Sequence, residues 1–326
     1  MKLTRRQSLH LMGTAFAAPF LSRAALAQSW PSKPIRAIVP VGAGSTIDII
    51  SRIVFEQLSR QLGQPIIMEN RPGAGGTIGG AAVARAEPDG YTFLVNSSQH
   101  SATPAFYPNA TYDTARDLAA VAALGSSPNV MVASPAKGFK TLRDLVTAAK
   151  AKSGGFAHGT PGVGSAAHLS AERFRLSAGF EGVHVPFRGM PEALTEVMTE
   201  RLDFACSSIA PALPLIRDGK LVALAVTTPQ RTPALPDVPT TLEAGYANSD
   251  YTFWTGMLLP AKTPREIVER LHQETTKALR APGVPEKLAQ QGIDPMPIAP
   301  AAFDAQIKTE IDNIIALVKA AGIKLN

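Results

Sequence analysis

The chain has 326 residues, of which 45% are hydrophobic and 18% charged, a composition typical of a folded globule and not of a disordered chain. Its net charge of +6 falls to +2 once the first 27 residues, with four basic and no acidic side chains, are set aside. That balance argues against nucleic acid or an anionic membrane surface as the partner. The single cysteine, Cys206, has no partner for an intramolecular disulfide, and the length allows two domains.

Residues 1–27 predict a cleaved export signal. Arg5 and Arg6 form its basic start, and residues 9–21 are apolar but too few to span a membrane. Residues 25–27 match a cleavage site with small side chains, and the paired arginines favour the twin-arginine route. We therefore expect an exported chain whose fold begins after the signal.

After the signal, strands and helices alternate, which predicts an α/β fold. The apolar runs predict strands at 35–39, 65–69, 91–95, 129–133, 156–158, 184–187, 203–207, 221–227 and 252–259. One helix is predicted to begin after residue 46, and a second one, after the next glycine-rich turn, is predicted to end at residue 86. Further helices are predicted over 141–152 and 166–178, from residue 191 onward, and over 264–279 and 300–321. The first three strands end in glycine-rich or polar loops, the third of them over residues 96–100. Ligands bind at the carboxyl ends of strands in an open parallel sheet, so we expect a binding site there.

The turn between the first strand and the first helix is the first candidate site. A serine or threonine can cap the helix, an aspartate in its first turn suits the helix dipole, and two glycines leave backbone N–H groups uncovered. Such a helix start attracts an anion, although a tight turn that needs glycine only for its geometry is the alternative. The candidate ligand-binding residues here are Val41, Gly42, Ala43, Gly44, Ser45, Thr46 and Asp48.

A counterpart of this turn lies in the second half of the chain, after the strand predicted at 156–158. It also carries two glycines and a serine, and it also opens a helix. Paired helix starts, one in each half, suit an anion held between two domains. The candidate residues here are Thr160, Pro161, Gly164, Ser165 and His168.

Three further strand ends carry polar or aromatic candidates. An arginine that directly follows a strand can contact an anionic ligand or form a surface salt bridge, and both interpretations stay open. Serine hydroxyls supply neutral hydrogen-bond donors at the same edge. These candidates are Ser97, Ser98, Gln99, Phe187, Arg188, Gly189, Ser207 and Ser208.

Motifs typical of enzymes are missing from the sequence. The glycine turns lack the lysine of a nucleotide-binding P-loop, and Ile47 occupies the third glycine position of a dinucleotide fingerprint. No nucleophile elbow, no His-Glu-x-x-His sequence and no cysteine pair occurs. We therefore expect a binding protein with no catalytic residue, no metal site and no cofactor.

Seven stretches together resemble the tripartite tricarboxylate transporter substrate-binding proteins, the TctC or Bug (Bordetella uptake gene) family. The resemblance covers essentially all of residues 28–326, and the stretches 70–76 and 233–240 are the most specific. The matching stretches are 39–48, 69–76, 88–92, 126–129, 162–169, 185–189 and 233–240.

The resemblance implies a two-domain periplasmic binding protein of the type II-like, Venus-flytrap design, with a mixed, mostly parallel sheet in each domain. Residues 28–127 with 249–326 are expected to form domain I, and residues 128–248 domain II. The resemblance further implies that a small carboxylate is held between the two glycine turns. The ligand would then pass to a membrane permease of the tripartite tricarboxylate transporter type, and the binding protein is expected to be monomeric.

The sequence departs from the family pattern in places that bear on the ligand. Val41 stands where an aromatic residue is common, and Ser45 and Thr46 stand where glycines are common. The strand at 203–207 ends without the aspartate often found there, so the ammonium group of an amino acid would lack a counter-charge. This favours a plain mono- or dicarboxylate, aromatic acids included. A ligand sensor for a membrane receptor and a secreted α/β enzyme acting on a small acid are the alternatives.

Overall fold

The computed structural model describes residues 30–187 and 189–323, so the predicted signal at 1–27 and Arg188 lie outside the described residues. The described residues from Lys33 onward form one compact unit. Within the described residues, no helix combines the length and apolar character needed to cross a membrane.

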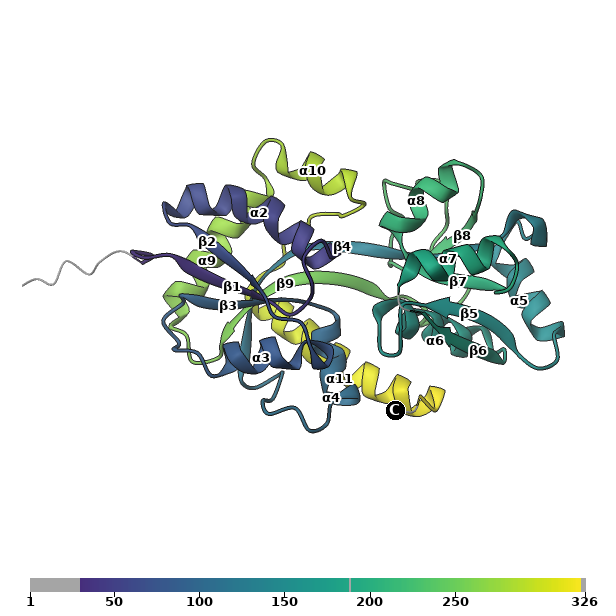
Figure 1. Ribbon diagram of the computed structural model, residues 1–326, viewed down its shortest axis with the longest axis horizontal. Helices are drawn as coiled ribbons and strands as arrows, with labels where there is room; N and C mark the ends of the chain where they lie inside the picture. The colour runs from purple at the N-terminus through teal and green to yellow at the C-terminus, as the bar shows by residue number, and fades with distance from the viewer. Residues whose placement is uncertain (1–29, 188, 324–326) are drawn as a thin grey trace, which may run out of the picture. The chain divides into compact units, whose positions relative to one another are not determined.

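A nine-stranded sheet organises this unit, with strand order β2-β1-β3-β9-β4-β7-β5-β6 and β8 paired to β4 (Figure 1). The α/β prediction is therefore confirmed, and each predicted strand is present, with small shifts at its ends except at β4, which is much longer than predicted. The strands are β1 (Ile35–Val39), β2 (Ile66–Asn70), β3 (Thr92–Ser97), β4 (Leu118–Ala133), β5 (Phe156–Thr160), β6 (Gly182–Pro186), β7 (Phe204–Ser208), β8 (Val222–Val226) and β9 (Thr252–Pro260).

Strand β4 belongs to two parts of the sheet. From Leu118 to Pro128 it pairs with β9, and from Asn129 to Ala133 it pairs with β7 and β8. We call β2, β1, β3, β9 and the start of β4 the first sheet, and the end of β4 with β5–β8 the second sheet. In the first sheet only β9 runs against the other strands, and in the second only β4 does. The expected mixed, mostly parallel sheets are confirmed.

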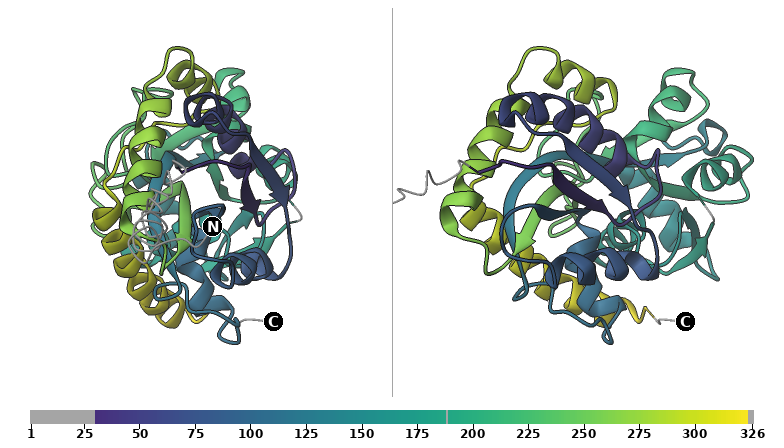
Figure 2. Two further views of the ribbon diagram at one scale, coloured as in Figure 1. Left: turned by 90° about the vertical axis from the view of Figure 1, so that its left-hand side faces the viewer. Right: turned by 60° about the vertical axis from the view of Figure 1, so that its left-hand side comes forward.

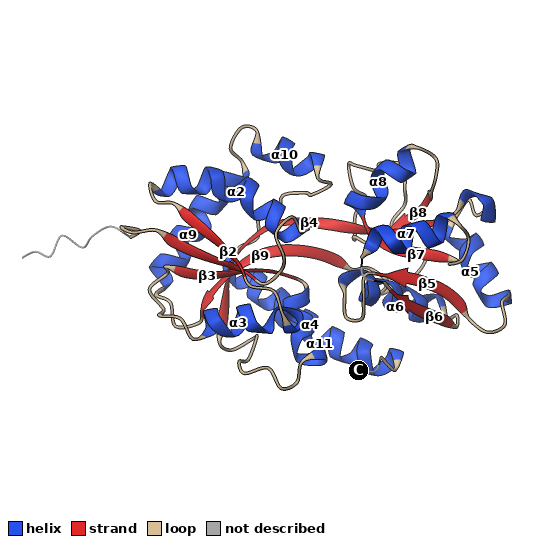
Figure 3. Cartoon of the chain, viewed as in Figure 1, coloured by secondary structure: helices blue, strands red, loops and turns tan. Residues whose placement is uncertain are grey.

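Helices cover both faces of each sheet (Figures 2 and 3). The helix α2 packs on α9 beside the first sheet, and α11 packs on α4 and β4. The helices are α2 (Thr46–Leu62), α3 (Thr77–Ala84), α4 (Gln99–Phe106), α5 (Leu142–Ala151), α6 (Ala166–Ala178), α7 (Met190–Met198), α8 (Ile209–Arg217), α9 (Arg265–Leu279), α10 (Val284–Gln290) and α11 (Pro300–Ala321), with short 3₁₀ turns at Ala74–Gly76 and Pro135–Lys137.

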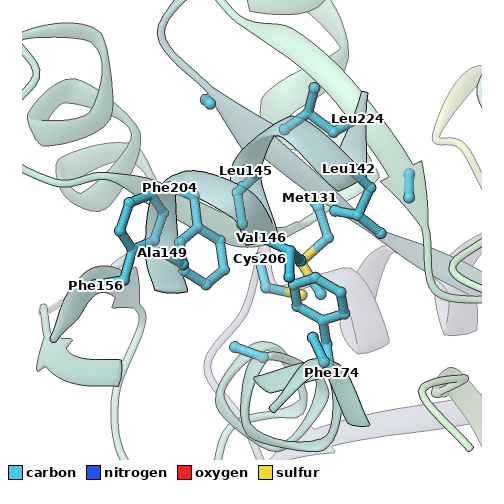
Figure 4. Packing of buried hydrophobic residues seen from close by; sticks show 14 of the residues in the cluster. Met131, Leu142, Leu145, Val146, Ala149, Phe156, Phe174, Phe204, Cys206 and Leu224 are labelled. Carbon is cyan, nitrogen blue, oxygen red and sulfur yellow. The ribbon is translucent and has the colours of Figure 1, made fainter. Parts of the chain in front are cut away.

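Each sheet has its own hydrophobic core. In the first, the rings of Trp254 and Phe303 meet edge to face at 4.9 Å. In the second, α5 and α6 pack their apolar faces on β4, β5 and β7, where Phe156 and Phe204 stack at 5.9 Å (Figure 4). Cys206 is a free thiol inside this core, and burial raises its pKa to about 12.

The fold differs from the predictions in one loop, in three helices and in the length of one strand. The loop expected at 96–100 is wrong, because β3 extends to Ser97 and α4 begins at Gln99. The helices α4, α8 and α10 were not predicted, since the first two hold a proline in their interior and the third is only seven residues long. Strand β4 starts eleven residues before the predicted strand at 129–133, because its alanine-rich start is stabilised by pairing with the distant β9.

The two sheets are also joined by backbone hydrogen bonds and by a helix. The carbonyl of Asn129 accepts the Thr227 N–H at 2.9 Å, and the carbonyl of Thr227 accepts the Tyr251 N–H at 2.7 Å. The long helix α11 begins on the first sheet and packs Ile314 in one buried cluster with Leu169 of α6. The chain therefore crosses between the sheets along β4 and again along the segment that precedes β9.

Candidate functional site

The turn after β1 is held by its own polar atoms. Gly44 adopts a left-handed conformation with φ of 79°, and its N–H donates to Oδ2 of Asp48 at 2.9 Å. Ser45 caps α2, since its hydroxyl accepts the Asp48 N–H at 3.3 Å, and its own N–H donates to the Gly42 carbonyl. Gly42 and Ala43 are exposed, and a Cβ at Gly42 would meet no atom within 4 Å. The expectation that the Gly44 N–H is uncovered is wrong, because Asp48 takes it.

Asp48 is the centre of this first turn. Its carboxylate accepts from Arg52 at 2.9 and 3.1 Å and from the Asn70 side chain at 3.1 Å. The same Asn70 amide donates to the Val41 carbonyl at 3.0 Å, which ties β2 to the turn. Burial alone would raise the pKa of Asp48, but the hydrogen bonds from Arg52, Gly44 and Asn70 outweigh it and hold the pKa below its usual value. Asp48 therefore shapes the turn, and its oxygens are occupied by the protein.

The turn after β5 repeats this geometry. Gly164 has a φ of 76°, and its N–H donates to Nδ1 of His168 at 3.1 Å. Ser165 caps α6 by accepting the His168 N–H at 3.2 Å, and the Ser165 N–H donates to the Gly162 carbonyl at 3.4 Å. The two turns thus match residue for residue, with an imidazole in place of the carboxylate.

Thr160 adds a second layer to this turn. It is fully buried, and its Oγ1 lies 2.6 Å from Nε2 of His184 and 3.3 Å from the Gly162 N–H, which it accepts. The hydroxyl of Ser165 donates to the Gly162 carbonyl at 2.8 Å. Side chains from β5, β6 and α6 therefore fix the backbone of this turn, while Pro161 is exposed.

The remaining candidates sit at the neighbouring strand ends. Ser97 and Ser98 are buried where β3 meets α4, and the Ser98 N–H donates to the Trp254 carbonyl at 3.1 Å. Ser207 is buried and donates its hydroxyl to the Ser208 carbonyl at 2.8 Å. Ser208 occupies the N-cap position of α8 without a capping hydrogen bond from its side chain, and it is partly exposed. The fold thus places serines of both sheets at the ends of strands, although the Ser207 hydroxyl already donates its hydrogen bond to a backbone carbonyl.

Two candidates follow β6. The Phe187 N–H donates to the Thr160 carbonyl at 2.9 Å, and the Phe187 ring would touch a Cβ added at Gly159. Gly189 precedes α7 as its N-cap. Phe187 therefore lies against the strand that leads into the second turn, and Gly189 lies at the start of α7, another helix that packs on the second sheet.

A crevice joins α4 to the second turn. Its lining includes Gln99, Phe106, Tyr107 and Val163. Phe106 packs so closely on Gly164 that an added Cβ would lie 3.2 Å from the ring. Phe106 and Tyr107 were not among the predicted site residues, because α4 was not predicted. The signals that could have found them are the adjacent aromatic residues shortly after a strand end.

Asn70 and Arg52 support the first turn, although neither was among the predicted site residues. Asn70 lies in a stretch that matches the family, which is a usable signal. Arg52 lies one helical turn after Asp48, a spacing at which an arginine reaches a carboxylate. Among the described residues, no group of three or more histidine, cysteine or acidic side chains is arranged to hold a metal ion.

Comparison with known proteins places the chain in a family. Residues 50–323 match the family described as "Tripartite tricarboxylate transporter family receptor". BugT of Bordetella pertussis is 32% identical over 327 aligned residues, with 100% of both chains covered. MatC from Rhodopseudomonas palustris, solved with bound malate, is 30% identical with a TM-score of 0.74, over 89% of this chain and 100% of MatC. Another R. palustris protein, solved with adipate, is 30% identical with a TM-score of 0.78, over 91% of this chain and 100% of its own.

Proposed function

The chain belongs to the tripartite tricarboxylate transporter receptor family, and we propose that it captures a small carboxylate between its two glycine turns. As a member of a transport receptor family it is a solute-binding protein and not an enzyme. The proposed ligand is a mono- or dicarboxylate, aromatic acids included. MatC and the adipate-bound relative, each solved with a dicarboxylate, support that class.

The observation that carries the proposal is the matched pair of helix starts. The first backbone N–H groups of α2 and of α6 have no carbonyl partner within their own helix, and both helices point their positive ends toward a glycine turn. Each helix dipole contributes about 0.3–1 kcal/mol to binding an anion, and each hydrogen bond to a charged group about 1.5–3 kcal/mol. Micromolar affinity needs about 8 kcal/mol, so several N–H and hydroxyl groups from both turns must act together.

The proposed contacts come from exposed or partly exposed members of the candidate set. In the first turn they are the backbone of Gly42 and Ala43 and the side chain of Thr46. In the second turn the proposed contact is the backbone N–H of Val163, an exposed residue outside that set, with Ser208 and Gly189 beside it. Asp48, His168 and Thr160 support these contacts from beneath, since their polar atoms already bind the turns.

We further propose that residues 28–127 with 249–326 form one domain and residues 128–248 the other. The change of β4 partners between Pro128 and Asn129, and the return of the chain before β9, support those limits. Closure about the two crossings would exclude water from the ligand, which strengthens its hydrogen bonds. Delivery to a membrane permease from the periplasm completes the proposal, in line with relatives described as periplasmic.

A thermal-shift screen of the mature chain tests the ligand class. The panel pairs succinate, adipate, malate and benzoate with the neutral succinamide and benzamide, and adds aspartate. At one hundred times Kd a ligand stabilises the fold by about 2.7 kcal/mol, which raises Tm by roughly 5 °C. A carboxylate that shifts Tm while its amide does not supports the proposal. No shift with any acid, or a shift with aspartate alone, contradicts it.

A further inference from the structure

The second turn rests on a stack of histidine rings that the proposed function does not use directly. The rings of His168 and His184 are parallel within 17° with centroids 3.8 Å apart. His158 continues the stack at 5.2 Å from His184 and ends against Phe204 at 5.3 Å. The three histidines come from α6, β6 and β5, so the stack joins the elements that carry the turn.

The hydrogen bond from Gly164 defines the state of the His168 ring. A backbone N–H can only donate, so Nδ1 of His168 must accept and is unprotonated. His168 is therefore a neutral imidazole with its hydrogen on Nε2. A protonated ring would present a donor to the Gly164 donor and break this contact.

Two charged groups beside the stack, Glu172 and Arg175, lie on α6. Oε1 of Glu172 is 3.5 Å from Nε2 of His158, and Arg175 binds Glu172 at 2.8 Å. Burial, with the neighbouring His184 and Arg175, lowers the pKa of His168 to about 3, and burial lowers that of His184 to about 4. The rings are thus neutral at and above pH 6, and the stack provides hydrogen-bond acceptors without a net charge.

His184 contacts the same turn through the hydroxyl of Thr160. Its Nε2 lies 2.6 Å from the hydroxyl of Thr160, which also accepts the Gly162 N–H. His168 and His184 therefore hold two different backbone N–H groups of one turn, the first directly and the second through Thr160. In the first turn, Asp48 accepts the Gly44 N–H as His168 accepts the Gly164 N–H in the second.

We propose that His168 and His184 are positioning residues for ligand binding: they hold the Gly162–Gly164 backbone in the conformation that receives the anion. A neutral acceptor keeps this turn free of negative charge beside the site. In the first turn Arg52 compensates the charge of Asp48, and the His168 ring needs no such partner. This proposal rests on the proposed function only where ligand affinity is measured.

The first test compares His168→Leu with His168→Asn. Asparagine places Oδ1 near the position of Nδ1 and keeps an acceptor for Gly164, whereas leucine removes it. We expect His168→Leu to weaken binding of the carboxylate found in the screen about tenfold, and His168→Asn to recover most of that loss, measured by calorimetry near pH 7. Equal affinities for the two variants would contradict the proposal.

The second test needs no ligand and so separates this proposal from the proposed function. Amide hydrogen exchange of Gly164 should accelerate about tenfold or more in His168→Leu and much less in His168→Asn. The Gly44 amide, held by Asp48, is the internal control and should stay protected in both variants. If Gly164 exchange is unchanged in His168→Leu, the positioning role is wrong, even where the ligand class is right.

The third test addresses His184 by a double-mutant cycle with Thr160. His184→Phe keeps a ring on the stack but loses the contact with the Thr160 hydroxyl, and Thr160→Val removes the hydroxyl. If the contact positions the turn, the double variant should bind no more weakly than the worse single variant. Strictly additive losses would show that the two residues act independently and would overturn this part of the proposal.

Discussion

The two glycine turns have one backbone design and two different chemistries beneath it. In both, a serine caps the helix, a glycine with φ near 80° turns the chain, and the side chain four residues later takes that glycine's N–H. Beneath the first turn lies a charged network of Asp48, Arg52 and Asn70, and beneath the second a neutral histidine stack. A backbone site for an anion can thus be supported by a compensated acid or by an uncharged ring. The two supports should respond differently to mutation and to pH.

The largest effect is expected from removing the acid of the first turn. Asp48→Leu leaves the Gly44 N–H and the Asn70 amide without their acceptor and should lower the free energy of unfolding by about 3 kcal/mol. Asp48→Asn keeps one acceptor oxygen and should lose about half as much. Chemical denaturation of the mature chain measures both. Equal losses would mean that the charge matters and the acceptors do not.

Alanine in place of the left-handed glycines separates strain from packing. Gly44→Ala meets open space, so only the positive φ opposes it, at about 1 kcal/mol. Gly164→Ala has the same strain and also presses on Phe106, so we expect about 2 kcal/mol in denaturant unfolding. Of the two substitutions, only Gly164→Ala adds an atom to the lining of the crevice beside α4. If Gly44→Ala is the more costly variant, the packing of Phe106 on the turn is misjudged.

Acid should weaken the support of the second turn before that of the first. The pKa of His168 in the folded chain is about 3, below its ordinary value of 6.5, so the unfolded chain binds more protons between these values. The stabilisation is complete above pH 6.5 and is lost as pH falls toward 3. The pKa of Asp48 is also lowered, but from 3.8, so its contribution is lost only below about that pH.

Unfolding curves between pH 7 and pH 4 therefore test the comparison. The free energy of unfolding of His168→Asn should fall less steeply than that of the unaltered chain, by about 1 kcal/mol per pH unit below pH 6. Asp48→Asn should run parallel to the unaltered chain over the same range. Parallel curves for all three proteins would contradict a neutral His168 in the fold.

The smallest effect concerns the two helix caps. Ser45→Gly loses one capping hydrogen bond and should cost a few tenths of a kcal/mol, since glycine is itself tolerated at an N-cap. Ser165→Gly loses the cap and also the bond to the Gly162 carbonyl, so about 1 kcal/mol is expected. Paired thermal unfolding scans resolve the difference. A larger loss at Ser45 would reverse the order that the contacts predict.

Much of the turn pattern could be predicted from sequence because its determinants are local. Glycine, serine and the residue four positions after the glycine lie within one stretch, so their spacing specifies the helix start. The partners Asn70 and His184 lie on other strands, and parallel pairing with β1 and β5 brings them under the turns. Such contacts depend on strand register, which a single sequence does not report.

The sequence by itself determined the α/β alternation, both helix starts and the family, since each follows from local periodicity or from a motif within a short stretch. Tertiary structure decided the length of β4, the presence of α4, and what lies beneath each turn. The reason is that weak local preferences, as in the alanine-rich start of β4, are overridden by hydrogen bonds and burial between distant segments. Asp48 and His168 were expected to contact the ligand, and the structure shows that Oδ2 of Asp48 and Nδ1 of His168 bind the backbone of their own turns.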